Sequence, residues 1–199
     1  MLAAFVHGFI LAMALILPLG PQNSFILTQG TRYRIKHVLP TIVTAAASDT
    51  FLIVLSVSGV SVLVSHFPVL RLVFTLGGSV FLLWMGFKSW RHVPSETADA
   101  APMSTGRQIR QSLSVSLLNP HAIFDTFVII GGGASLYGIS DERWAYAMAA
   151  ISVSWIWFVV LAAAGRLIWR WGGRKVLKVL NRGSAVLMWA IALKTLWSN

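Results

Sequence analysis

The sequence contains no cysteine among its 199 residues and only six acidic residues. The missing cysteine excludes disulfides, thiolate metal sites and thiol redox chemistry. Charged residues of both signs make up 11% of the chain, whereas a soluble domain of this size carries about a quarter. Apolar residues take their place, at 56% of the chain and with a mean hydropathy of +0.74. This balance predicts an integral membrane protein.

The net charge of +10 arises because 16 Lys and Arg residues outnumber the acids. These basic residues lie between apolar segments, not on an amphipathic face or an extended basic arm. Membrane topology therefore explains them better than nucleic-acid binding does. No basic region precedes the first apolar segment, so we interpret that segment as a retained span and not as a signal peptide.

Six segments are long and apolar enough to cross a bilayer, which takes about 20 residues. They cover residues 2–28 with an interruption, 38–64, 70–90, 111–136, 144–168 and 176–197. Connections one, three and five hold 13 of the 16 basic residues. The positive-inside rule places these connections in the cytoplasm and both termini outside.

The longest connection is rich in proline and serine and is interpreted as a cytoplasmic linker between two halves. The predicted organisation is a first three-helix repeat at 1–91, a linker at 92–110 and a second three-helix repeat at 111–199. Three spans on either side must insert in opposite orientations. The halves then form an inverted repeat if they are homologous, as the likeness of LPLGPQNSF at 17–25 to LLNPHAIFD at 117–125 indicates.

Proline interrupts the first and fourth apolar segments, where it removes backbone donors and opens the helix. The helix-breaking residues are Pro18, Gly20, Pro21 and Pro120. Carbonyls freed in hydrocarbon need hydrogen-bond partners, and the nearby carboxamides are those of Gln22, Asn23 and Asn119. A kink held by amide contacts is one interpretation. Because the break occurs twice and accompanies buried acids, we favour two unwound stretches that face a substrate.

Two acidic residues lie inside predicted spans, Asp49 at a depth of about 16 Å and Asp125 at about 21 Å. Within these spans only His121 could share a helix face with either acid, one turn before Asp125. The acids could be contacts between helices. Without a Lys or Arg partner they could also receive a proton, a metal ion or a cationic solute. A metal is the weaker choice, because a divalent ion usually needs more oxygen ligands than two Asp supply.

At these residues the sequence resembles the lysine/arginine exporter (LysE-type) family, most closely its arginine exporter (ArgO) branch. The matching stretches are LPLGPQNSFILTQG at 17–30, SDTFLI at 48–53, LLWMGF at 82–87 and LNPHAIFDTFVIIGG at 118–132. The loop after the third span and the C-terminus are shorter than in the family pattern. The resemblance implies an all-α, six-span exporter in the bacterial inner membrane, with both predicted outer termini in the periplasm.

The resemblance also implies L-arginine as substrate, with L-lysine and analogues such as canavanine as further candidates. It implies that the two acids, the carboxamides and the helix-breaking residues form the translocation site. From the residues we expect Asp49 and Asp125 to bind the cationic groups of arginine, with protons filling the empty site. His121 is a further candidate for substrate binding.

An exporter of neutral amino acids or of a metal cation with the same fold is the main alternative. An intramembrane hydrolase or a non-transporting assembly partner fits the two broken segments less well. We expect no enzymatic activity, no cofactor and no resident metal. Lipids are expected neighbours, and a homodimer fits so small a transporter, although no motif specifies one.

Overall fold

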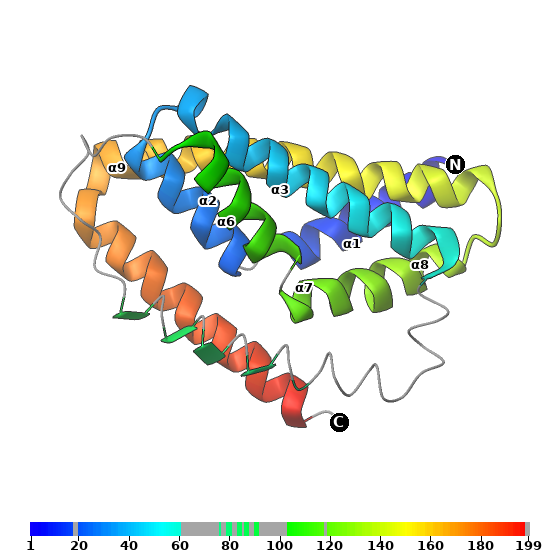
Figure 1. Ribbon diagram of the computed structural model, residues 1–199. Coiled ribbons are helices and arrows are strands. Elements are labelled where there is room, and N and C mark those ends of the chain that lie inside the picture. The colour runs from blue at the N-terminus through cyan, green and yellow to red at the C-terminus, as the bar shows by residue number, and fades with distance from the viewer. Residues whose placement is uncertain are drawn as a thin grey trace.

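The computed structural model describes residues 1–17, 20–60, 76, 79–80, 83–84, 86–87, 90–91, 103–117 and 119–197. Within these ranges the chain is helical and has no strand (Figure 1). Most of the third predicted span and of the predicted linker lies outside the described residues, as does Pro18. The division into two inverted repeats therefore stays a prediction.

The first predicted span consists of two helices, α1 (Leu2–Ile16) and α2 (Pro21–Arg32). Their axes differ by 75°. Pro21 is the first residue of α2, a position where the missing N–H has no intrahelical partner to lose. The residue before it, Gly20, has extended backbone angles and ends the irregular stretch.

The second span is α3 (Ile35–Leu55), which continues into one π-helical turn, η1 (Ser56–Val60). Four helical elements lie in and just before the predicted fourth span. They are α6 (Thr105–Leu117), α7 (Pro120–Asp125), η2 (Thr126–Ile130) and α8 (Gly131–Ser135). α6 begins six residues before the predicted span, so the end of the predicted linker is helical. A turn in which Gly138 has a φ of 57° then leads into α9.

α9 (Asp141–Trp197) is one helical run of 57 residues. The two last predicted spans fall within it, so their connection is helical and not a loop. Figure 1 shows α9 changing direction sharply between its yellow and orange parts. Within the described residues, Ile35–Gly59 and Asp141–Ile168 are long and apolar enough to cross a membrane. The bent pair α1 and α2 gives a third such segment if it crosses as one.

The first part of α9 is the centre of the packing, with α1, α2 and α3 against it (Figure 1). Glycines allow the backbones to approach closely, because a Cβ at Gly30 would strike the carbonyl of Ala162 and one at Gly165 that of Leu27. Small residues are the usual means of helix packing in lipid, where burial between helices gains little hydrophobic energy. α2 and α9 are therefore held at a fixed, short separation near the carboxyl-terminal end of α2.

Two apolar clusters fill the space between these helices. The amino-terminal core comprises Ala4, Ala12, Ile53, Val57, Ile130, Ala134, Tyr146, Ala147, Ala150 and Val153. The second core comprises Ile26, Leu27, Val38, Ile42, Ala45, Ala46, Phe158, Leu161 and Ala162. The helix break and Asp49 fall between the two clusters in the order of the chain.

Candidate functional site

The break between α1 and α2 is held by the carboxamide of Asn23. Its Nδ2 donates to the backbone carbonyl of Ile16 at 2.5 Å, and its side chain is buried. Ile16 is the last residue of α1, so this carbonyl has lost its intrahelical partner. Asn23 thus satisfies a backbone group that would otherwise cost several kcal/mol in hydrocarbon.

Gln22 has a different role from its neighbour. Its Nε2 donates to Oδ1 of Asp49 at 3.0 Å, which connects the first turn of α2 to the middle of α3. Ser154 of α9 is a second hydrogen-bonding partner of the same carboxylate. Both partners are uncharged, and no basic side chain pairs with Asp49 in the described part of the chain.

The Asp49 carboxylate is half-buried, whereas Ser154 is buried. The next residues along each helix are also in contact, because Nε1 of Trp155 donates to Oγ1 of Thr50 at 3.2 Å. Two adjacent polar contacts therefore fix the register of α3 against α9. They position the carboxylate at the junction of α2, α3 and α9.

Asp125 ends α7 and is half-buried. The next residue is joined to the second span, because Oγ of Ser56 donates to the carbonyl of Thr126 at 2.8 Å. Ser56 lies seven residues after Asp49, which is about 10 Å along a helix. The structure thus places the two acids on neighbouring segments at different heights.

The second break, between α6 and α7, presents buried acceptors. Asn119 is the N-cap residue of α7 in an extended conformation and is buried. Within the described residues, its Oδ1 and the Oγ of Ser116 have no hydrogen-bond partner. A buried polar atom left unpaired costs about 1–3 kcal/mol. These oxygens are suited to receive N–H donors from a solute or water.

The contact between α3 and α6 includes buried polar groups. Oγ1 of Thr41 donates to Oε1 of Gln108 at 3.0 Å, and Oγ of Ser112 donates to the carbonyl of Thr41 at 3.1 Å. Gln108, Ser112 and Ser116 are four residues apart and lie buried on one face of α6. This polar seam leads along α6 to the second break.

Some predicted site residues have no described side chain. Pro120 and His121 belong to the backbone of α7, but their side chains lie outside the described residues. Among the described residues, no group of three or more His, Cys, Asp or Glu side chains is close enough to hold a metal ion.

Sequence reasoning predicted neither the contact of Ser154 with Asp49 nor the polar face of α6. The spacing of four among polar residues was the signal for the polar face of α6. No pattern marked Ser154, because a serine hydroxyl can also bond to its own helix, as Ser152 does to the carbonyl of Met148 at 2.7 Å.

The family model described as "LysE type translocator" matches residues 13–199, which include both helix breaks, Asp49 and Asp125. The chain belongs to the LysE type translocator family. The chain is therefore a transporter of the LysE type. No solved structure shows a significant match to it.

Three relatives illustrate the extent of the similarity. YisU of Bacillus subtilis (strain 168), a candidate amino-acid transporter by its name, is 45% identical over 95% of this chain and 87% of its own length. The arginine exporter protein ArgO of Serratia proteamaculans (strain 568) is 38% identical over 100% of this chain and 98% of its own. ArgO of Escherichia coli (strain K12) is 38% identical over 98% of this chain and 93% of its own length.

Proposed function

We propose that this LysE-type chain exports L-arginine from the cytoplasm across the inner membrane in exchange for protons. The observation that carries the proposal is the Asp49 carboxylate, held inside a membrane-spanning helix by the neutral donors Gln22 and Ser154. Inserting a charged residue at such a depth costs about 2.5–3.5 kcal/mol on insertion scales. Residues that carry this cost commonly have a function in transport.

The carboxamide of Gln22 occupies the position that a substrate N–H group would take. An amide N–H is a weaker partner for a carboxylate than a guanidinium, which is charged and can donate two parallel bonds. Arginine would therefore displace Gln22 and bond to Asp49 directly.

The remaining groups of arginine match other features of the breaks. Asp125 would receive the second cationic group, and the unpaired oxygens of Asn119 and Ser116 would accept further N–H donors. The first turn of α2 has no side-chain cap, so its N–H groups at Gln22 and Asn23 would face the α-carboxylate.

Proton exchange follows from the requirement for neutrality. A bound proton and a bound cation are alternative ways to neutralise a carboxylate in hydrocarbon, so arginine binding would release protons and arginine release would favour their uptake. Export of one positive charge against an inside-negative potential costs about 2.3 kcal/mol per 100 mV. Inward movement of two protons per arginine would reverse the sign of this term.

L-lysine and analogues such as canavanine carry the same α-amino-acid group and a cationic or guanidine-like end, so we propose them as further substrates. An exporter of neutral amino acids is the competing proposal. The neutral donors around Asp49 favour this competing proposal, because they can also form hydrogen bonds to a protonated carboxyl group.

The test is counterflow in proteoliposomes with labelled L-arginine inside and unlabelled competitors outside. We expect L-arginine and L-lysine to exchange, while threonine, homoserine and divalent cations do not. A pH gradient that is acidic outside the liposomes should drive net efflux. Exchange supported by threonine but not by arginine would overturn the arginine assignment in favour of the neutral substrate.

A further inference from the structure

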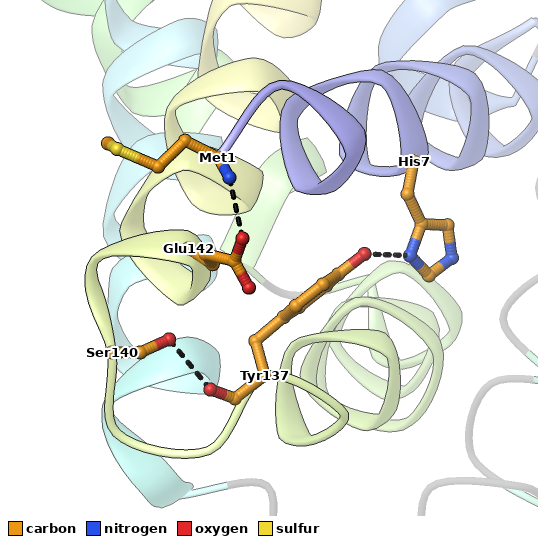
Figure 2. A network of polar contacts seen from close by, with 5 residues as sticks. All are labelled: Met1, His7, Tyr137, Ser140 and Glu142. Atoms are coloured by element: carbon orange, nitrogen blue, oxygen red, sulfur yellow. Dashed lines mark hydrogen bonds and ion pairs between the residues drawn. The ribbon is translucent and has the colours of Figure 1, made fainter.

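Three aromatic side chains meet where α1, the turn before α9 and the start of α9 come together. His7 Nδ1 and the Tyr137 hydroxyl are 2.8 Å apart (Figure 2). The His7 ring lies edge-on to Tyr146 with ring centres 5.3 Å apart, and the two tyrosine rings are 5.8 Å apart. We call His7, Tyr137 and Tyr146 the aromatic cluster.

A second, weaker contact lies beside the aromatic cluster. The amino group of Met1 pairs with Oε1 of Glu142 at 2.6 Å, and both groups are largely exposed (Figure 2). Exposed ion pairs contribute at most about 1 kcal/mol. Ser140 shapes the intervening turn by donating to the carbonyl of Tyr137 at 2.7 Å. The start of α1 is thus fastened to this turn by contacts that are easily broken.

Tyr146 is fully buried, yet its hydroxyl has no hydrogen-bond partner in the described part of the chain. Glycines make room for it: a Cβ at Gly133 would strike the hydroxyl, and one at Gly8 would strike the backbone carbonyl of Tyr146. An unpaired buried hydroxyl costs about 1–3 kcal/mol. This penalty disappears in any arrangement that lets water reach the group, so it lowers the free-energy cost of opening the packing.

The aromatic cluster lies beyond the Asp49 site, at the amino-terminal end of the molecule. Tyr146 precedes Ser154 by eight residues on α9, which is about 12 Å. The amino-terminal core between them consists of Ala, Ile and Val side chains apart from Tyr146 itself. In the opposite direction, α3 meets α6 through the polar side chains of Thr41, Gln108 and Ser112. The amino-terminal side of the Asp49 site is therefore closed by the apolar amino-terminal core and the aromatic cluster. On the other side lie the second core and the hydrogen-bonded contacts of Thr41 with Gln108 and Ser112.

We propose that the aromatic cluster is the gate that closes the translocation pathway at the amino-terminal end. Opening it separates α1 from the turn at 136–140 and from the start of α9, and wets the Tyr146 hydroxyl. The inference rests on the proposed function in that the Asp49 site lies on a substrate pathway.

Locking the gate tests it directly, because the chain has no cysteine to interfere. In a His7→Cys/Tyr137→Cys variant, a short cleavable bis-thiol reagent should bridge α1 to the turn. We expect arginine efflux to be lost on bridging and recovered on reduction, with arginine binding retained. The control pair Tyr137→Cys/Ser140→Cys bridges two residues of one turn and should keep its efflux. Undiminished efflux of the bridged His7–Tyr137 variant overturns the proposal.

An accessibility measurement tests the gate without any substrate. A Ser154→Cys probe is placed at the level of the site, and a membrane-impermeant thiol reagent is applied to one face at a time. Adding His7→Ala and Tyr137→Ala should speed labelling from the face that carries the amino-terminus and leave the other face unchanged. The control is Leu136→Ala, at a side chain 76% exposed beside Tyr137.

Equal labelling rates with and without the His7 and Tyr137 substitutions overturn the gate, as does an equal increase from both faces. Absence of arginine transport by the unaltered protein would instead contradict the proposed function. The labelling result would still decide the gate for whichever solute the chain carries, so the two failures are distinguishable.

Discussion

Replacing Asp49 with asparagine removes one negative charge and changes little else. The carbonyl oxygen of the introduced carboxamide can still accept from Nε2 of Gln22, a contact 3.0 Å long in the structure, so the contact between α2 and α3 is retained. The hydroxyl of Ser154 also keeps a partner, because it can both donate and accept. We therefore expect Asp49→Asn to enter the membrane in normal amount and with normal thermal stability.

Transport by Asp49→Asn should nevertheless fall sharply. A buried cation that loses its carboxylate partner is destabilised by about 3 kcal/mol or more. Since 1.4 kcal/mol is a factor of ten, the affinity for arginine should fall by about a hundredfold or more. The assay is counterflow of labelled L-arginine in proteoliposomes, together with binding to the purified protein in detergent.

The matched control is Asp141→Asn, the same chemical change at an exposed acid in the first turn of α9. It should transport arginine at the unaltered rate. Asp49→Glu should restore part of the binding, since the charge returns on a longer side chain. Arginine binding by Asp49→Asn within about threefold of the unaltered protein, far below the hundredfold loss expected from the missing charge, would refute the assignment of Asp49 to the substrate cation.

Three further substitutions separate the site from its scaffold. Gln22→Ala removes the donor that competes for Asp49, so arginine should bind as tightly or more tightly in a direct binding measurement; a loss of binding would show that Gln22 contacts the substrate itself. Asn23→Ala leaves a freed carbonyl at the helix break and should lower the thermal unfolding temperature more than Gln22→Ala does. Gly30→Val introduces a Cβ against the carbonyl of Ala162, so folded protein should be lost from the membrane, whereas normal yield would contradict the close packing of α2 on α9.

The sequence predicted the helical class, the position of the first helix break and the place of Asp49 within an apolar helix, because each has a strong local cause. Proline removes a backbone donor and favours a helix break, although α3 continues through Pro40. The apolar residues on both sides of Asp49 place it in the middle of a long helix. The structure ends α1 at Ile16 and begins α2 at Pro21, which surrounds the predicted interruption.

Partners across helices were harder to predict, because they depend on how the helices rotate against each other. Gln22 and Asn23 are adjacent amides of similar chemistry, yet one reaches the carboxylate of another helix and the other reaches back to the carbonyl of Ile16. A rotation of about 100° per residue separates their directions on a helix. Which of the two faces α3 is decided by the packing of α2 on α9, and single-sequence patterns do not contain it.

The length of α9 was not predicted for a related reason. Charge clusters suggested a connection between the last two spans, but basic residues are also good helix formers. The chain therefore stays helical through Arg166 and Lys175, although α9 changes direction sharply along its length (Figure 1). Boundaries set by hydropathy mark where a helix leaves the apolar layer, not where it ends.

The candidate site is formed by residues from both predicted halves of the chain, and this has a mechanical consequence. Gln22 and Asp49 come from the segments before residue 60, whereas Ser154 and Trp155 come from α9. A rearrangement that moves α9 relative to α3 must break the two polar contacts that join them. The neutral bonds to Asp49 contribute about 0.5–3 kcal/mol each, which is small enough for a bound guanidinium to replace. We propose that a substrate cation bound at Asp49 replaces its bond to Ser154, so that substrate binding and movement of α9 are coupled at this carboxylate.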